Sequence, residues 1–249
     1  MVAALTGISS ARYDMNGRGP FTRAYIIAAS YRSGSTHLCT RLWETGVLGA
    51  PFEYLNQEHE MKYLYSRLGA ASPQDYVNRL MACRMSDNGV FGLKVHFHHF
   101  RAALRIHPEL LQRLSPLQFI FIRRDDKIAQ AVSLAKAYQT RAWLGLNAIE
   151  RADIPLFYSR DFIAACLEEV NRQEIGWTSW FEARGLQPHV ISYEELLNDE
   201  QRVVGKVRAL LGADSDPRSS DGPVPSLQRQ YDRVNEEWIA RFRAESSAN

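Results

Sequence analysis

Four short stretches of the chain consist almost entirely of apolar or β-favouring residues. These stretches are 24–30, 90–96, 117–123 and 189–193. Continuous hydrophobicity, as opposed to strict alternation, is typical of parallel strands that are covered on both faces. The intervals between the stretches are long enough for helical crossovers. The pattern therefore predicts an α/β fold in which a central parallel sheet lies between two layers of helices.

Two of the intervals show helical periodicity next to the predicted strands. Residues 36–45 place apolar side chains at helical spacing and end at Gly46. Residues 126–140 do the same, with Asp125 or Asp126 able to cap the first turn. Further helices are predicted at 57–68, 73–83, 100–114, 160–183, 200–211 and 227–245. The last of them follows a loop rich in Ser, Asp, Gly and Pro and is too short to bury a core by itself.

The domain organisation follows from these elements. We predict one α/β domain over residues 23–249, with a docked C-terminal arm. Residues 1–22 contain no apolar stretch long enough for a signal peptide and are predicted to be a flexible N-terminal leader. The longest apolar runs, such as 25–29 and 119–122, are far short of the roughly 20 residues of a membrane-spanning helix.

Composition and charge narrow the classes of function. Of the 249 residues, 45% are hydrophobic, which is enough for a continuous core and excludes disorder of the bulk of the chain. The 30 Lys and Arg residues against 28 Asp and Glu residues leave a net charge of +2, so we expect no nucleic-acid partner and only a local anion site. Cys39, Cys83 and Cys166 are odd in number and far apart, which indicates neither disulfides nor zinc and fits a reducing cytoplasm.

The most informative segment is Ser30-Tyr-Arg-Ser-Gly-Ser-Thr36, which joins the first predicted strand to a helix. Small residues let the backbone approach an oxyanion, and the N–H groups and dipole of the helix start favour negative charge. Arg32 can grip the same anion with its planar guanidinium. The alternative is an ordinary strand-to-helix turn with an exposed arginine.

The segment differs from the Walker loop of P-loop kinases, which has two glycines and a lysine before Ser or Thr. Here one glycine and the lysine are missing. This disfavours a metal-dependent kinase and favours a phosphate-ester donor held without metal by arginine and backbone amides. A P-loop kinase-like phosphotransferase acting on a small alcohol and a non-catalytic nucleotide-binding module stay open as alternatives.

On these and several further segments, the chain resembles the bacterial carbohydrate sulfotransferases of the trehalose type, which use 3′-phosphoadenosine-5′-phosphosulfate (PAPS). The matching segments are 30–36, 45–54, 89–94, 124–133, 139–143, 176–181, 229–232 and 237–238. Several motifs in the family's order are more specific than any single one. The resemblance implies a P-loop-like sulfotransferase fold, PAPS as sulfuryl donor, a carbohydrate acceptor, no metal, and a homodimer.

The resemblance also assigns roles to residues at matching positions. The 5′-phosphosulfate would be held by Arg32, Ser33, Gly34, Ser35 and Thr36, and Arg32 would also stabilise the charge that develops during transfer. The 3′-phosphate would be held by Arg124 and Ser133, and Arg229 and Gln230 of the C-terminal arm would close over the nucleotide. Glu53 occupies the position of the general base. The alternatives are an ion pair of Arg124 with a nearby aspartate, a solvated helix face at 229–230 and an ordinary surface glutamate at position 53.

Three weaker signals lie near these segments. Lys94, at the end of the second strand, would point into the same crevice at the carboxyl edge of the sheet and bind the PAPS cofactor there, or reach solvent. Residues 96–99 contain a His-x-His-His cluster, which an alternating strand end explains better than a metal site. Trp143 could line an acceptor pocket or pack in the interior. The aromatic residues of 177–181 are predicted to lie in the core, with a platform for base stacking as the alternative.

The acceptor is the least determined part of the reaction. Tyr31 and Phe52 stand beside the loop and the base at positions where the trehalose enzyme has polar glutamines. These two residues favour a more apolar acceptor, such as a glycolipid, over trehalose itself.

Overall fold

The computed structural model describes residues 7–57, 60–143, 154–213 and 231–247. Its centre is a four-stranded sheet in the order β2-β1-β3-β4, in which every neighbouring pair is parallel. The strands are β1 (Arg23–Ala29), β2 (Val90–His96), β3 (Leu117–Arg123) and β4 (His189–Ser192). The four predicted strands and their parallel arrangement are confirmed.

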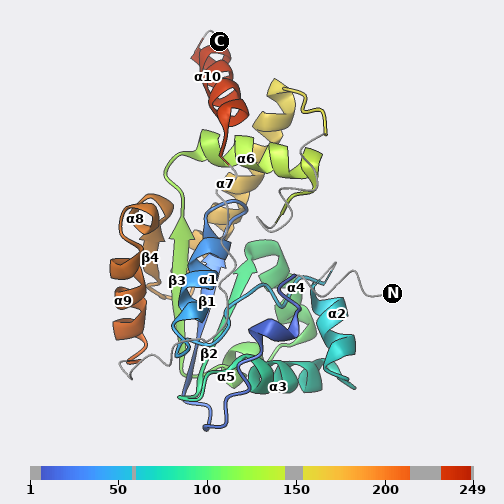
Figure 1. The fold of residues 1–249 in the computed structure, drawn as a ribbon, viewed down its shortest axis with the longest axis vertical. Helices are drawn as coiled ribbons and strands as arrows, with labels where there is room; N and C mark the ends of the chain where they lie inside the picture. The colour runs from blue at the N-terminus through green and yellow to red at the C-terminus, as the bar shows by residue number, and fades with distance from the viewer. Residues whose placement is uncertain (1–6, 58–59, 144–153, 214–230, 248–249) are drawn as a thin grey trace.

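Helices cover both faces of this sheet (Figure 1). In Figure 1, α1 (Ser35–Glu44) lies in front of the sheet and α7 (Arg160–Glu182) behind it. The remaining helices are α2 (Glu60–Arg67), α3 (Pro73–Arg84), α4 (Phe97–Ile106), α5 (Leu110–Arg113), α6 (Lys127–Thr140), α8 (Tyr193–Asn198), α9 (Glu200–Leu210) and α10 (Arg233–Ser247). In the part of the chain that the structure describes, no helix is both long and apolar enough to cross a membrane.

The predicted helix over 100–114 is wrong in its extent. The chain instead forms α4 from Phe97 to Ile106 and a separate short α5 from Leu110 to Arg113. Pro108 explains the break, because proline disfavours helical backbone in the residue before it. The earlier start of α4 also corrects the interpretation of the histidine cluster. Only His96 belongs to β2, and residues 97–99 form the first turn of α4.

The main hydrophobic core surrounds β1 and β2. The side chains of β1 from Ala24 to Ala29 are fully buried, as continuous hydrophobicity predicts. Trp177 packs its ring on Phe100 and donates its indole N–H to the carbonyl oxygen of Ala29 at 3.1 Å. The predicted core position of the 177–181 aromatic residues is confirmed, and this packing fixes α7 against the carboxyl end of β1.

A second, smaller core joins α6, α7 and α10. Trp238, Ile239 and Phe242 of α10 are buried in it. At the start of the helix, the amine of Lys136 donates to Asp232 Oδ1 at 2.7 Å and to Asn235 Oδ1 at 2.6 Å. The C-terminal helix therefore docks on α6. The predicted contacts of Arg229 and Gln230 with the nucleotide lie outside the described residues.

The N-terminal segment is anchored where the sequence predicts a flexible leader. Ile8 and Tyr13 belong to the main core, and the prediction is wrong from residue 7 onward. The anchor is Arg84, which is fully buried and donates to the carbonyl oxygens of Ile8 and Ser10. Asp14 balances its charge, with Arg84 Nη1 at 3.2 Å from Asp14 Oδ1. Because Arg84 is distant in the sequence, the residues around Ile8 show no hydrophobic pattern that would predict their burial.

We expect Asp14→Asn to destabilise the fold by about 3–5 kcal/mol, because it leaves the buried guanidinium of Arg84 without its anion. Urea denaturation at pH 7 measures this loss. The control is Glu237→Gln, which removes a carboxylate from an exposed ion pair with Arg233 and should leave the denaturation midpoint unchanged. Equal midpoints for both variants would contradict the anchoring role of Arg84.

Candidate active site

The carboxyl ends of the four strands meet at one edge of the sheet. Ala29 is in register with His96 on one side and Ile122 on the other, and Arg123 is in register with Ser192. The segments that follow the strands therefore emerge together. These segments are the β1–α1 loop (residues 30–36) after β1, the start of α4 after β2, Arg124 after β3 and Tyr193 after β4. Ligands of open α/β sheets bind at this edge.

The β1–α1 loop has the local features of an oxyanion-binding loop. Arg32 has a φ of 57°, which is strained for a non-glycine residue and typical of functional loops. Gly34, at the N-cap of α1, also has a positive φ and provides no side-chain cap, so the first N–H groups of α1 have no capping side chain. The hydroxyl of Ser33 is buried and finds no hydrogen-bond partner among the described residues. Ser35 and Thr36 form the first turn of the helix.

Gly34 is required for a further reason that the sequence does not show. A Cβ atom at this position would lie 2.3 Å from the ring of Tyr193, the first residue after β4. The guanidinium of Arg124 lies over the same ring, 4.8 Å from its centroid. Tyr193 thus contacts both predicted anion sites. Sequence reasoning misses this role, because residues 193–195 carry only the signal of a helix start.

The two predicted anion sites are in direct contact. Arg32 Nε donates to the hydroxyl of Ser133 at 3.0 Å, and Arg32 Nη1 donates to the carbonyl oxygen of Trp143 at 3.0 Å. Burial, together with the nearby charge of Arg124, lowers the pKa of Arg32 to about 10. Two arginines at close range favour an anion between them, since its charge would offset their repulsion.

Glu53 and Lys94 form the second part of the site. Lys94 Nζ lies 2.7 Å from Glu53 Oε2, with both side chains largely buried. His96 Nε2 is 3.4 Å from the same oxygen, and His99 Nδ1 is 3.2 Å from Oε1. Burial by itself would raise the pKa of Glu53, but the charge of Lys94 and the bonds from the histidines outweigh it and hold this pKa well below its ordinary value. Glu53 is therefore a carboxylate at neutral pH.

A histidine and tyrosine cluster covers this carboxylate. The ring of Tyr31 lies over His96, with 4.4 Å between centroids, and its hydroxyl is 3.1 Å from His98 Nε2. Burial and the neighbouring His99 lower the pKa of His98 to about 4. These histidines are functional candidates that the sequence analysis explained as a strand end. Their spacing in the sequence was visible. That their side chains meet at one place depends on the start of α4 at Phe97.

Phe52 does not face the site. Its side chain is 2% exposed and packs against the ring of Tyr13, with centroids 4.6 Å apart. The inference of an apolar acceptor therefore loses one of its two residues. Tyr31 does lie in the site, and its ring is 6.1 Å from that of Trp143, which is 40% exposed.

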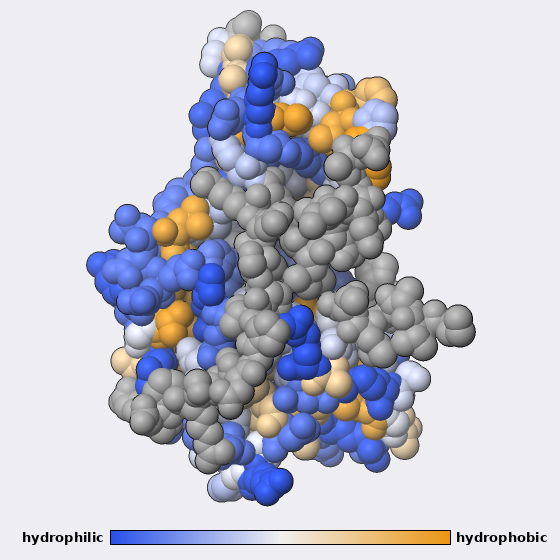
Figure 2. Space-filling model, viewed as in Figure 1, coloured by the Kyte–Doolittle hydropathy of each residue, from blue (hydrophilic) through white to orange (hydrophobic). Residues whose placement is uncertain are grey.

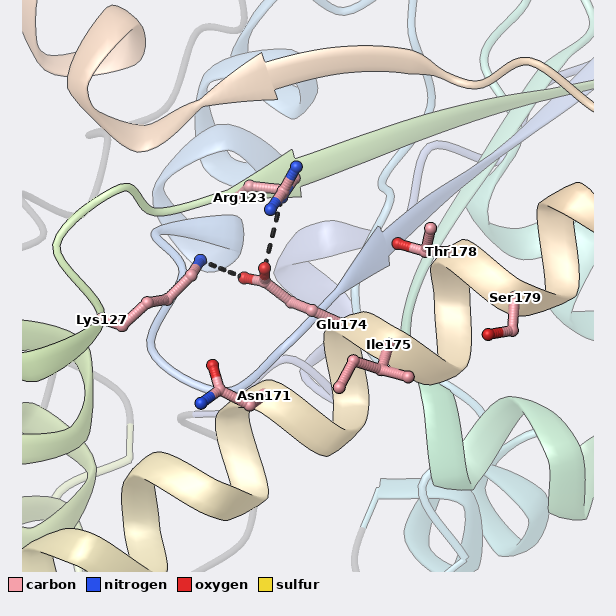
Figure 3. A pocket seen from close by; sticks show the side chains of 7 residues that line it. All are labelled: Arg123, Lys127, Asn171, Glu174, Ile175, Thr178 and Ser179. Carbon is pink, nitrogen blue, oxygen red and sulfur yellow. Dashed lines mark hydrogen bonds and ion pairs between the residues drawn. The ribbon is translucent and has the colours of Figure 1, made fainter.

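Glu174 of α7 lies beside the carboxyl end of β3 (Figure 3). Its carboxylate lies between Arg123 and Lys127, at 3.2 Å from Arg123 Nε and 2.5 Å from Lys127 Nζ. The same carboxylate accepts from Ser30 Oγ at 3.4 Å, and Lys127 Nζ also donates to the carbonyl oxygen of Arg124. This network ties the end of β1 to the end of β3, and so holds the β1–α1 loop and Arg124 at fixed separation.

The chain is similar over most of its length to known sulfotransferases. The family model described as Stf0 sulphotransferase matches residues 24–245. The trehalose 2-sulfotransferase of Mycolicibacterium smegmatis is 30% identical over 262 residues, which covers 90% of this chain and 95% of that protein. The trehalose 2-sulfotransferase of Mycobacterium tuberculosis is 28% identical over 261 residues, with 90% and 96% covered.

Solved structures agree on the fold. A sulfotransferase domain from the curacin biosynthetic pathway superposes with a TM-score of 0.51 at 12% identity, covering 92% of this chain and 99% of that one. A sulfotransferase from Alicyclobacillus acidocaldarius gives a TM-score of 0.50 at 16% identity, covering 91% and 93%. Together with the family match and the sheet-edge geometry, these similarities confirm the predicted resemblance. The chain belongs to the Stf0 sulphotransferase family.

Proposed function

We propose that this protein transfers the sulfuryl group of PAPS to a hydroxyl of a carbohydrate or glycolipid, with a general base and without a metal. The observation that carries the proposal is the convergence of the β1–α1 loop with Arg124 and Ser133 at one sheet edge. PAPS carries anionic groups at both the 5′ and the 3′ position of its ribose. A site with two arginines and an uncapped helix start matches that charge pattern.

The residues of the β1–α1 loop would bind the 5′-phosphosulfate. PAPS supplies an activated sulfuryl group whose leaving group is adenosine 3′,5′-bisphosphate. The buried hydroxyl of Ser33 and the N–H groups of α1 provide donors for the anion, and Arg32 neutralises the charge that grows on the leaving oxygen. Arg124 and Ser133 would bind the 3′-phosphate. Lys94 serves the acceptor side instead, where it pairs with Glu53.

The acceptor would enter beside Tyr31. Its ring begins a series of aromatic contacts that continues through Trp143 and Tyr138 to Phe162, each partly exposed. Figure 2 shows a group of hydrophobic residues near the start of α7, beside α6. Aromatic faces stack on sugars and pack on acyl chains. Both a carbohydrate and a glycolipid acceptor fit this surface. The homodimer and the cytoplasmic location that the resemblance implies stay predictions.

Different observations count against the two alternative functions, a kinase-like phosphotransferase and a non-catalytic nucleotide-binding module. Membership in a sulfotransferase family and the missing Walker lysine count against a kinase-like phosphotransferase. A non-catalytic nucleotide-binding module would keep the anion site but have no use for the buried group around Glu53. A radiolabelled transfer assay from PAPS to trehalose and to a glycolipid panel tests this alternative and the acceptor together.

A thermal shift measurement tests the donor directly. At about 100 times its Kd, adenosine 3′,5′-bisphosphate should stabilise the protein by about 2.7 kcal/mol, more than ADP or Mg²⁺-ATP at equal concentration. Arg124→Ala should remove the preference for this nucleotide over adenosine 5′-monophosphate, since only the 3′-phosphate distinguishes the two. The control Arg202→Ala removes an exposed arginine of α9 and should keep the preference. Stronger stabilisation by Mg²⁺-ATP would refute the proposed donor.

A further inference from the structure

Gln130 of α6 is a fully buried polar side chain whose amide points at the β1–α1 loop. Its Nε2 lies 2.5 Å from the carbonyl oxygen of Tyr31 and 2.9 Å from the hydroxyl of Ser30. Because a carbonyl oxygen only accepts hydrogen bonds, the nitrogen of the amide must face the loop and donate to it. The amide oxygen of Gln130 is buried and finds no hydrogen-bond partner among the described residues.

This unpaired oxygen shows that packing alone does not explain a glutamine at position 130. A buried polar atom without a hydrogen bond destabilises the fold, and an apolar side chain of similar size would fill the same space without that loss. The two hydrogen bonds that the amide donates to the loop are what glutamine adds here. Local features that oppose stability are typical of residues that support a functional site.

The hydroxyl of Ser30 links Gln130 to a charged network on α7. Its Oγ lies 3.4 Å from Glu174 Oε1, and this carboxylate is held between the cations of Arg123 and Lys127. A carboxylate only accepts hydrogen bonds, so Ser30 donates to Glu174 and accepts from Gln130. The direction of each hydrogen bond is thereby fixed, and the loop is held from α6 and α7 together.

The hydrogen bond to Tyr31 acts on the backbone of Arg32. The carbonyl group of Tyr31 and the nitrogen of Arg32 belong to one planar peptide unit, and the φ angle of Arg32 is the rotation about the next bond of the chain. Holding this plane therefore restricts that rotation. The φ of Arg32 is 57°, a conformation that non-glycine residues adopt only where the surroundings enforce it. The bond from Gln130 is such a restraint.

The same helix also holds the side chain of Arg32. Gln130 and Ser133 are three residues apart on α6, about one helical turn, and so lie on the same face of the helix. Ser133 accepts from Arg32 Nε at 3.0 Å, while Gln130 holds the peptide unit that precedes Arg32. One helix therefore fixes both the backbone and the guanidinium of this arginine.

We propose that Gln130 is a positioning residue of the donor site, which holds the β1–α1 loop in the conformation that presents Arg32 and the first N–H groups of α1 to PAPS. This inference rests on the proposed function, since it concerns the donor of the same sulfuryl transfer. Without Gln130, the loop would relax to a more common backbone conformation. PAPS would then bind only the fraction of molecules in which the strained conformation forms again, and its apparent affinity would fall by that fraction.

The test is Gln130→Met, which keeps the approximate size of the side chain and removes both donated hydrogen bonds. We expect the Kd of adenosine 3′,5′-bisphosphate and the KM for PAPS to rise about 10- to 100-fold. The kcat at saturating PAPS should change less than about threefold, because bound donor restores the loop. The KM for the acceptor should stay unchanged. A merely structural role would instead lower the amount of active enzyme and leave Kd and KM as they are.

A second comparison tests whether Gln130 acts through Arg32. In Arg32→Gly the arginine is absent, and glycine adopts a positive φ without strain. If Gln130 acts by holding Arg32, then adding Gln130→Met to Arg32→Gly should raise the Kd of adenosine 3′,5′-bisphosphate less than about threefold further. Non-additivity of this kind is the expected result for two residues that act as one unit. Isothermal titration measures all four proteins.

The matched control is Tyr25→Phe. Tyr25 is also fully buried, and its hydroxyl donates to a backbone carbonyl oxygen, that of Leu48, at 2.8 Å. It lies near the amino end of β1, away from the β1–α1 loop. The variant should lower Tm but keep the Kd of adenosine 3′,5′-bisphosphate and the KM for PAPS.

Two results would overturn the inference. One is a Kd of Gln130→Met equal to that of wild type, and the other is the same fold-increase with arginine and with glycine at position 32. If Gln130→Met does not fold, Ser30→Ala replaces it in both comparisons, because it removes one of the two oxygens that Gln130 holds, and the same two results decide. A wild-type protein that binds no adenosine 3′,5′-bisphosphate would instead refute the proposed function, and this is seen before any variant is made.

Discussion

Replacement of Arg32 by alanine is expected to lower sulfuryl transfer by about 10³-fold or more, the range seen when a group that stabilises developing charge is lost. Arg32 is the residue that links the β1–α1 loop to Ser133 and lies close to Arg124. Its removal should also weaken the binding of adenosine 3′,5′-bisphosphate. Steady-state kinetics and isothermal titration measure the two effects.

The same variant should not be less stable in the absence of nucleotide. The pKa of Arg32 is lowered by burial and by the charge of Arg124, so its charged form is held against unfavourable terms that alanine removes. We therefore expect an unchanged or higher Tm without nucleotide and a smaller Tm shift with it. Arg32→Lys keeps the charge but not the planar fork and should be intermediate. The control Arg41→Ala removes an arginine of α1 that pairs with Glu44 and should bind nucleotide normally. Normal binding and turnover in Arg32→Ala would rule out its assigned role.

The second large effect is expected for Glu53→Gln. Nucleotide binding should survive, because Glu53 lies among Lys94 and the histidines and not in the β1–α1 loop. Transfer should fall by at least about 10²-fold, because the variant lacks the proposed acceptor of the hydroxyl proton. Rapid-quench measurement of a single turnover isolates this chemical step from nucleotide release.

The control Glu200→Gln removes a carboxylate that also faces a histidine, His37, at 2.9 Å, but on α9 outside the site. Turnover of Glu53→Gln equal to that of Glu200→Gln would exclude Glu53 from the reaction.

Most of the fold could be predicted, because strands buried on both faces leave continuous apolar runs in the sequence. The errors arose where structure depends on contacts that are distant in the chain. Residues 7–22 looked polar and flexible, but Arg84 anchors them from within the core. The extent of α4 was wrong at both ends, at Pro108 and at the histidines that begin the helix.

The candidate site was predicted in part. The residues of the β1–α1 loop are contiguous, so a motif could reveal them. Glu53 and Arg124 were assigned by resemblance. Tyr193 was missed because residues 193–195 indicate only the start of a helix, and the histidines of 96–99 were noticed but explained as a strand end. Phe52 was assigned to the site from its place beside Glu53, but neighbouring residues outside a helix point in different directions, and Phe52 packs on Tyr13.

The sequence by itself determined the parallel sheet, the position of the glycine-containing β1–α1 loop and the family, since each is a property of contiguous residues. The tertiary structure decided which side chains meet. Arg32 and Ser133 are 101 residues apart, and Glu53 and His99 are 46 apart. Such contacts depend on strand register and on the direction in which each helix leaves the sheet. Strand register and helix direction are both set by packing of the whole core, so they cannot be predicted from a local sequence pattern.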